Sequence, residues 1–414
     1  GYAQHFSTLL FMRILQGISG AALLPASAAM VADAFAEDSR ARALGAYGSL
    51  LGFGLALGPV IGSFILAHSS WRWIFWINVP ISVISLIICL CVTRESRSSQ
   101  PMKIDLLGTI LLVISLALLV LNINLAANVA WLSLPMLLLL TASIIGFILF
   151  FKHQSRHAAA IVPLHLLTKP SVMIGNFTAA ATVSPGWVCL FLLPIYLFAM
   201  LQMSVLAVGQ YIFIMTAMTI IAPIIAGWIF EKISRSIAIY MGFVFAISGL
   251  ILMCFLQTNG PIWLIVVSFI IFGIGWGAGN GTAIPSAIKG ESNTDHAALI
   301  SGIILTSLNL VAVVLLSIAT TVFSRVEQTQ LSRLLKQRGF ELSHEQLIKI
   351  KSLLAQPHDM IRYLHQLHHS LSSHQIKKIF DSAFMHGLSE AFFVVALVSF
   401  ILMISTIVVQ RRSQ

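Results

Sequence analysis

Two charged side chains within long apolar stretches could carry proton chemistry. Glu390 is the only acidic residue clearly inside the later stretches, where a carboxyl group can bind and release a proton. It lies about six residues from one end of its stretch, so it could instead extend to the membrane rim. Arg13 lies about five residues inside the stretch 8–33, and Gln16 lies one turn further on a similar face. A buried charge is costly, so Arg13 either faces an interior cavity or snorkels to the headgroups.

Uncharged polar residues in the same stretches could face a substrate cavity. Each could equally form a hydrogen bond that holds two helices together. The candidates are Asn176, Tyr196, Tyr211, Asn280 and Asn309.

The sequence offers no enzyme site. It lacks GxSxG, HExxH and GxxxxGK[ST], so it has no motif for hydrolysis of esters, peptides or ATP. His365, His368 and His369 have a spacing that can bind zinc, but no cysteine or acid at ligand spacing accompanies them. A solvated helix face is therefore favoured over a metal site. We expect no enzyme activity and no cofactor, and any energy would come from an ion gradient.

About eleven apolar stretches must position these residues. The chain of 414 residues is 58% hydrophobic and only 9% charged, whereas soluble domains carry about 25% charged residues. This composition predicts a polytopic membrane protein, and each span should be a helix because lipid satisfies no backbone group. The expected spans are 8–33, 43–67, 74–93, 104–122, 131–151, 172–200, 205–230, 237–257, 262–288, 298–323 and 384–409.

The distribution of lysine and arginine orients these spans. One alternate set of loops holds 13 of the 24 Lys and Arg residues, and the short loops of the other set hold only Arg72. The long segment 324–381 holds nine more, but long loops translocate largely regardless of charge. The positive-inside rule then places the C-terminus in the cytoplasm and the N-terminal end outside. The rule also explains the excess of positive charge, so no nucleic-acid partner is expected. The long polar segment 324–381 would lie outside, where its pattern predicts a helical hairpin or bundle.

The stretch 45–63 carries six glycines and one proline, although it is apolar enough to span a membrane. Gly54, Gly58 and Gly62 recur every four residues, a spacing that lets another helix approach closely. Pro59 lacks an N–H group and allows a bend. These features alone predict a tightly packed helix, with or without a transport role. A second smooth face carries Gly45, Gly48 and Gly52.

The full spacing G-x8-G-x3-G-P-x2-G is more specific. It is met at Gly45, Gly54, Gly58, Pro59 and Gly62, and it resembles the antiporter motif in the fifth helix of major facilitator superfamily drug/proton antiporters. The family usually has another glycine after this motif, where this chain has Ser63.

Neighbouring segments strengthen this resemblance. The stretch 9-LLFMRILQGISGAALLP-25 is similar to the family's fourth helix, and 71-WRWIFWINVPI-81 is similar to the signature of the fourteen-helix EmrB/QacA-type subfamily. The resemblance implies that Arg13 takes part in proton coupling, by tuning the pKa of an acidic partner. It also implies that the chain starts just before the fourth helix, with three helices absent.

Charged residues near the expected cytoplasmic ends resemble the family's gating networks. Arg40 resembles an arginine that follows the family's fourth helix. Glu231 and Arg235 lie in 227-GWIFEKISRS-236, which resembles a degenerate second copy of the family's cytoplasmic loop motif. Ordinary positively charged flanks of membrane helices are the alternative. In addition, 273-GIGWGAGNGTAIPSA-287 echoes 13-RILQGISGAALLPAS-27, as expected for a transporter with two related halves.

Together, these similarities imply an all-α polytopic membrane protein of the major facilitator superfamily fold, with about 11 of an expected 14 transmembrane helices. Residues 1–95 would be the remainder of the N-terminal half, 96–155 two extra central helices, and 156–414 the C-terminal half.

The implied function is proton-coupled export of hydrophobic or cationic drugs across a bacterial cytoplasmic membrane by alternating access. The partners would be a drug-like small molecule, protons, the lipid bilayer and, in double-membraned bacteria, a periplasmic adaptor protein. Two alternatives remain open. One is an exporter of a specific solute such as a siderophore or metabolite, and the other is an inactive truncated product or membrane scaffold.

Overall fold

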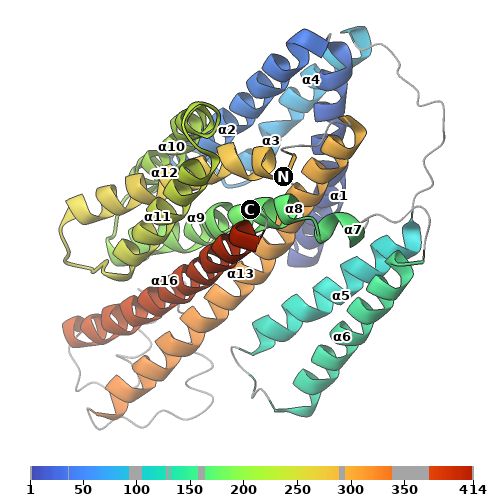
Figure 1. The fold of residues 1–414 in the computed structure, drawn as a ribbon. Coiled ribbons are helices and arrows are strands. Elements are labelled where there is room, and N and C mark those ends of the chain that lie inside the picture. The colour runs from blue at the N-terminus through green and yellow to red at the C-terminus, as the bar shows by residue number, and fades with distance from the viewer. Residues whose placement is uncertain are drawn as a thin grey trace. The chain divides into compact units, whose positions relative to one another are not determined.

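The computed structural model describes residues 2–35, 37–92, 105–126, 129, 132–156, 164–288, 294–337 and 373–412. These residues form two compact units (Figure 1). Unit 1 comprises Gly1–Pro101 and Ser204–Ile220, and unit 2 comprises Met102–Met203 and Ile221–Gln414. The boundaries predicted near 95 and 155 stay predictions.

Unit 1 is built from apolar helices that follow one another along the chain, joined by part of a later helix. The 32-residue helix α2 continues through Pro59, and its first turns carry the charged residues that precede the glycine-rich stretch. The helix α10 contributes its residues up to Ile220 to unit 1 and the remainder to unit 2. The helices are α1 (Phe6–Ala34), α2 (Glu37–His68), α3 (Trp73–Trp76), α4 (Asn78–Val92) and α10 (Val205–Lys232).

Unit 2 begins with a helical hairpin of α5 (Leu106–Leu125) and α6 (Leu134–Gln154). Buried residues recur every seven positions along both helices, which is the spacing of a long helix–helix contact, and Gln154 is buried in addition at the end of α6. Polar members of this stripe bond across the hairpin: Ser143 Oγ donates to the Ser115 carbonyl at 2.9 Å, and Asn122 Nδ2 donates to the Met136 carbonyl at 2.7 Å. The buried stripes are Gly108, Ser115 and Asn122 on α5, and Met136, Ser143 and Phe150 on α6.

The remaining helices of unit 2 pack through glycines that admit a neighbouring backbone. A side-chain carbon placed on Gly249 would lie 2.5 Å from the backbone nitrogen of Phe272, and one on Gly186 would lie 2.5 Å from the Trp276 ring. Large buried side chains fill the space between these contacts. The elements are α7 (Leu164–Leu167), α8 (Pro170–Thr178), the π-helix η1 (Ala179–Val183), α9 (Pro185–Ile195), the π-helix η2 (Tyr196–Met200), α11 (Arg235–Cys254), α12 (Ile262–Ile288), α13 (Thr294–Lys336) and α16 (Ser373–Arg412).

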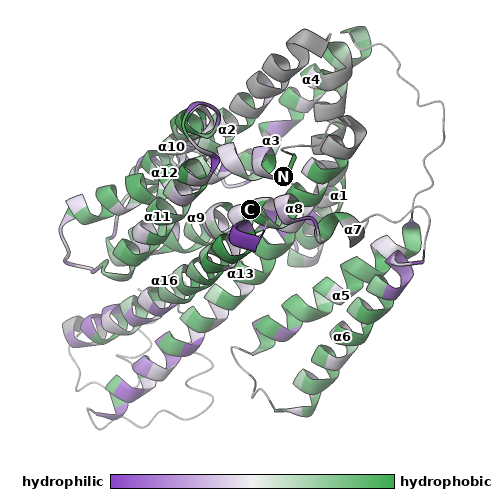
Figure 2. Cartoon of the chain, viewed as in Figure 1, coloured by the Kyte–Doolittle hydropathy of each residue, from purple (hydrophilic) through white to green (hydrophobic). Residues whose placement is uncertain are grey.

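Within the described residues there are eleven candidate membrane spans and no strands, which confirms the predicted helical class. Two candidate spans are longer than a bilayer requires. Leu299–Lys336 has 38 residues and Lys377–Arg412 has 36, whereas about 20 residues cross the hydrocarbon core. The ends of α13 and α16 nearest residues 337–372 are hydrophilic (Figure 2).

These long helices contain the two ends of the segment 324–381, because α13 continues unbroken to Lys336 and α16 starts at Ser373. The predicted hairpin or bundle stays a prediction. The two helices pack against each other, and Phe323 and Phe384 meet edge to face with ring centroids 5.0 Å apart. The rest of the segment lies outside the described residues, and so do the histidines at 365, 368 and 369.

Candidate functional site

The helix α10 approaches the glycine-rich helix α2 closely at Gly209. A side-chain carbon placed on Gly209 would lie 2.6 Å from the Pro59 carbonyl oxygen and 2.5 Å from Ser63 Cβ, so only glycine fits there. Two turns further along α10, Thr216 Oγ1 lies 3.3 Å from the Ala56 carbonyl oxygen and donates a hydrogen bond to it. Gly52 continues the contact, because its Cβ position would lie 3.4 Å from the Thr219 carbonyl oxygen. We call this contact the α2–α10 seam.

The seam uses a different face of α2 from the one suggested by the every-fourth-residue spacing. Gly54, Gly58 and Gly62 have no atom within 4 Å of their Cβ positions in the described structure. Gly52 belongs instead to the second smooth face expected from the sequence. The space that lets the two helices approach comes largely from Gly209 on α10. Ser63 lies at the centre of the contact with 6% of its surface exposed. Gly45 lies within α2, but its surroundings are outside the described features.

Arg13 and Gln16 lie together on α1, with Arg13 Nη1 donating to Gln16 Oε1 at 3.0 Å. The guanidinium carbon of Arg13 also lies 4.6 Å from the centroid of the Phe75 ring on α3, a cation–π distance. Phe75 belongs to the segment 71–81, so the structure brings two of the family-like segments into direct contact. Both Arg13 and Gln16 are exposed, and the proton-coupling role of Arg13 stays a prediction.

The predicted cytoplasmic charge network is only partly described. Arg235 begins α11 and donates from Nη2 to the Ser286 carbonyl at 2.7 Å, which ties α11 to the end of α12. Its Nε is buried and has no hydrogen-bond partner, and the same holds for Ser286 Oγ. Glu231 is exposed at the end of α10. Arg40 lies in α2, and its side chain is outside the described features.

The polar cavity candidates fall into different environments. Tyr196 is fully buried, and its hydroxyl donates to the Gln257 carbonyl at 2.9 Å, so it holds the turn after α11. Asn309 donates to the Leu305 carbonyl of its own helix at 2.8 Å. Asn280 is exposed and Tyr211 is half-buried. Asn176 is half-buried, and its Oδ1 is a buried acceptor without a partner.

A buried carboxyl group was missed by sequence reasoning. Glu327 on α13 is 2% exposed, because α16 packs over it at Gly387, where an added Cβ would lie 3.2 Å from Glu327 Cβ. Glu390, the acid singled out from the sequence, is exposed. Glu327 lies beyond the apolar run of its helix, so only the continuation of α13 and its pairing with α16 could reveal its burial.

Asp105 joins the two ends of the α5–α6 hairpin. It is 4% exposed and accepts hydrogen bonds from Gly108 N–H at 2.8 Å and Gln154 Nε2 at 2.6 Å, while His153 Nε2 lies 2.8 Å from Oδ1. Burial acts to raise the pKa of Asp105, but these hydrogen bonds and the attraction of His153 outweigh it and hold the pKa below its ordinary value. The carboxylate therefore stays ionised and fastens α5 to α6.

These features define an all-helical, multi-pass membrane protein with glycine-mediated helix contacts and polar groups between helices. The family model described as Major Facilitator Superfamily matches residues 1–316, and the chain belongs to this superfamily of transporters.

Several characterised relatives show how broad the family's substrates are. The chain is 30% identical over 281 residues to the riboflavin transporter RibZ of Clostridioides difficile, covering 67% of this chain and 59% of that protein. It is 29% identical over 293 residues to multidrug resistance protein 3 of Bacillus subtilis, covering 69% and 56% respectively. It is also 29% identical over 402 residues to the vacuolar basic amino acid transporter 2 of Saccharomyces cerevisiae, covering 92% and 83%. The chain thus spans well under two thirds of the first two relatives.

A solved structure supports the fold. The crystal structure of a bacterial homolog of the human lysosomal transporter Spinster, in an inward-facing and unoccupied conformation, aligns with a TM-score of 0.58 at 15% identity. The alignment covers 99% of this chain and 78% of that one.

Proposed function

We propose that this chain acts in proton-coupled export of hydrophobic or cationic compounds across a bacterial cytoplasmic membrane, with its C-terminus in the cytoplasm. The observation that carries this proposal is the α2–α10 seam, in which the helix that holds the antiporter-like motif meets α10 through Gly209 and Ser63. A contact without bulky side chains leaves little room for ions or water to leak between two helices. Such a seal is needed by an antiporter, because a proton leak would dissipate its driving force.

Arg13 supports the same proposal. An arginine within a span favours the ionised form of a nearby carboxyl group, so it would lower the proton affinity of an acidic partner. Its bond to Gln16 and its stacking on Phe75 hold the guanidinium in one orientation. We assign the chain to the fourteen-helix EmrB/QacA-type subfamily on the segments 9–25, 45–63 and 71–81, with a periplasmic adaptor as a further proposed partner in double-membraned bacteria.

Relatives named for drug export support the choice of substrate. Besides multidrug resistance protein 3, the chain resembles the multidrug transporter MdtP of Bacillus subtilis at 25% identity over 279 residues. It also resembles the tetracenomycin C resistance and export protein of Streptomyces glaucescens at 24% over 276 residues. A second candidate is transport of one specific solute, since the relatives RibZ and vacuolar transporter 2 are named for riboflavin and basic amino acids.

Reconstituted vesicles separate these functions. The 414-residue chain is placed in proteoliposomes, a pH gradient is imposed, and the fluxes of three unrelated cationic dyes, riboflavin and lysine are measured. Export of several dyes that collapses when the gradient is dissipated supports the proposal. Flux of a single solute favours the specific transporter, and no flux of any solute refutes transport by this chain.

A further inference from the structure

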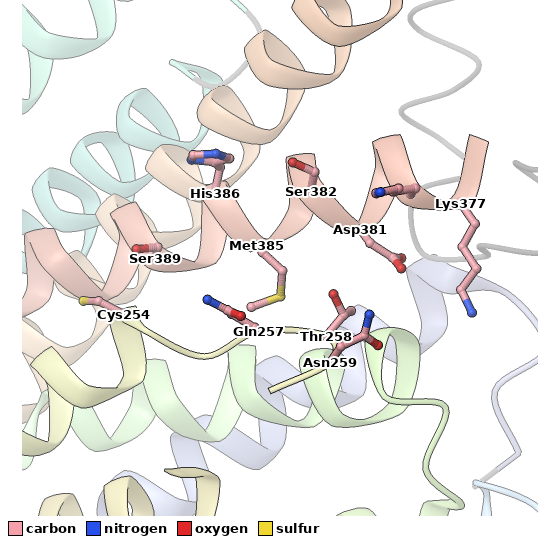
Figure 3. Close-up of a pocket in the computed structure, with 11 residues that line it drawn as sticks. Cys254, Gln257, Thr258, Asn259, Lys377, Asp381, Ser382, Met385, His386 and Ser389 are labelled. Atoms are coloured by element: carbon pink, nitrogen blue, oxygen red, sulfur yellow. The ribbon is translucent and has the colours of Figure 1, made fainter. Parts of the chain in front are cut away.

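A cavity of about 630 Å³ lies in unit 2 between the turn after α11 and the first turns of α16 (Figure 3). Its size falls in the range of small-molecule sites, about 300–1,000 Å³. None of the site candidates predicted from the sequence lines it. Its polar walls include Gln257, Thr258, Asn259, Lys377, Lys378 and Asp381.

One wall of the cavity is held in place before any ligand binds. The buried Tyr196 hydroxyl donates to the Gln257 carbonyl at 2.9 Å, and Gly260 N–H donates to the same oxygen at 3.3 Å. The opposite wall is the regular helix α16. Because both walls have defined backbone, a ligand would pay little ordering entropy on entry.

The cavity lies at the depth of lipid headgroups. The candidate span of α11 ends at Cys254, which lines the cavity. About 20 residues cross the hydrocarbon core, so counting back from Arg411 at the end of α16 places the other boundary near residue 391. Met385 and Ser389 line the cavity just beyond that point. Both estimates put the floor of the cavity at the edge of the hydrocarbon.

Two exposed aromatic residues lie next in sequence to the turn that lines the cavity. Phe255 directly follows the cavity residue Cys254 and is 63% exposed, and Trp263 follows the same turn with 63% exposed. Tryptophan favours the headgroup layer because its large apolar ring carries a polar N–H group. The turn 255–263 therefore suits contact with lipid.

The charges in the cavity select the kind of headgroup. Lys377 and Lys378 provide ammonium groups that attract a phosphate. Asp381 lies one turn along α16 from Lys377, and its carboxylate points toward Thr258 and Asn259 (Figure 3). A carboxylate repels a simple anion, but it stabilises a ligand that carries a cation beside its phosphate. A primary ammonium can also donate hydrogen bonds to that carboxylate, whereas a quaternary ammonium has no N–H to donate.

We propose that this cavity binds the headgroup of a phospholipid with a phosphate and a primary ammonium, of the phosphatidylethanolamine class. The phosphate lies against Lys377 and Lys378, and the ammonium lies against Asp381. The cavity candidate Tyr196 supports one wall of this site through Gln257 but does not line it, and the lipid proposal does not depend on the proposed transport function.

Lipid competition tests the proposal. The purified chain is placed in nanodiscs that contain equal amounts of dioleoyl phosphatidylethanolamine and dioleoyl phosphatidylcholine, and retained lipid is measured by native mass spectrometry. We expect the ethanolamine lipid to be retained preferentially. The double variant Lys377→Gln, Lys378→Gln should lower its retention about tenfold, the loss expected for a charge-assisted hydrogen bond. Asp381→Asn should remove the preference while total phospholipid retention persists.

Three controls make the outcome decisive. Lys232→Gln changes an exposed lysine at the end of α10, far from the cavity in sequence, and should leave retention unchanged. Thermal unfolding of each variant shows that it is folded. Inorganic phosphate and phosphoethanolamine, added at millimolar concentration, test soluble sources of the same chemistry.

The results either support or overturn the site. If neither soluble compound displaces the lipid, the result supports a lipid headgroup as the ligand. Full displacement by phosphoethanolamine overturns the lipid source in favour of a soluble ligand. Equal retention of both lipids by the wild-type chain, or unchanged retention in the folded double lysine variant, overturns the proposal.

Discussion

Replacement of Gly209 by alanine tests whether the α2–α10 seam is a tight contact. The added Cβ would lie 2.5 Å from Ser63 Cβ and 2.6 Å from the Pro59 carbonyl oxygen, where ordinary contacts begin at 3.4 Å. The two helices must therefore separate by nearly 1 Å. Neither contact is the end of a flexible side chain, so the backbone itself must move. Overpacking of this kind costs about 1–3 kcal/mol.

Gly58→Ala is the matched control. Gly58 lies on α2, the other helix of the seam, and nothing lies within 4 Å of its Cβ position. Alanine favours a helix over glycine by about 1 kcal/mol at both positions, so this gain cancels when the two variants are compared. The free energy of unfolding of Gly209→Ala should therefore be about 1–3 kcal/mol lower than that of Gly58→Ala.

The assay is thermal or denaturant unfolding of purified variants in one detergent, with tryptophan fluorescence as the signal. A third variant, the double change Gly209→Ala with Ser63→Gly, removes one of the two clashing groups and should recover part of the loss. Equal stability of Gly209→Ala and Gly58→Ala would refute the reasoning. A failure of Ser63→Gly to recover stability would show that Ser63 is not part of the contact.

Three further changes test other parts of the molecule. Arg325 donates from Nη2 to the Val129 carbonyl at 3.0 Å and also donates to the Ala126 carbonyl at the end of α5. Arg325→Met should therefore lower the free energy of unfolding by about 1–3 kcal/mol and speed amide exchange around residue 126. Unchanged exchange there would contradict the role of Arg325 in holding the end of α5. The pKa of Asp105 lies below its ordinary value of 3.8, so its carboxylate stabilises the fold above about pH 4 and this contribution is lost as the pH falls through the folded-state pKa. Asp105→Asn should therefore flatten the acid side of the stability profile between pH 5 and 2, which denaturant titrations measure, and a profile parallel to wild type would exclude it. Arg13→Ala should abolish proton-driven dye flux in vesicles while membrane insertion persists, and retention of flux in this variant would remove Arg13 from coupling.

The elements of the fold were largely predictable, and their contacts were not. The eleven spans follow from composition, because a long apolar helix is the stable choice for a chain in lipid. The every-fourth-residue spacing correctly marks α2 as a helix of small residues but does not say which face meets a neighbour. That depended on Gly209, which lies about 150 residues further along the chain. The serine that departs from the family pattern proved to be central to the contact.

Buried ionisable groups show the same limit. Glu390 lies inside an apolar stretch and its side chain is exposed, and its role in proton coupling stays a prediction. Glu327 follows the apolar run of α13, where the local sequence gives no sign of burial, and packing against α16 buries it to 2% exposed. Local composition reports whether a segment enters the membrane, whereas burial of one side chain depends on which helix lies over its face.

The sequence by itself determined the membrane class, the helices and the family, because apolar length and motif spacing are properties of a continuous stretch of chain. Only the tertiary structure decided which face of α2 forms the seam, that Arg13 stacks on Phe75, and that the turn after α11 and the helix α16 together line a cavity. Each of these depends on residues far apart in sequence, and their contacts are selected by the fit of whole helix surfaces.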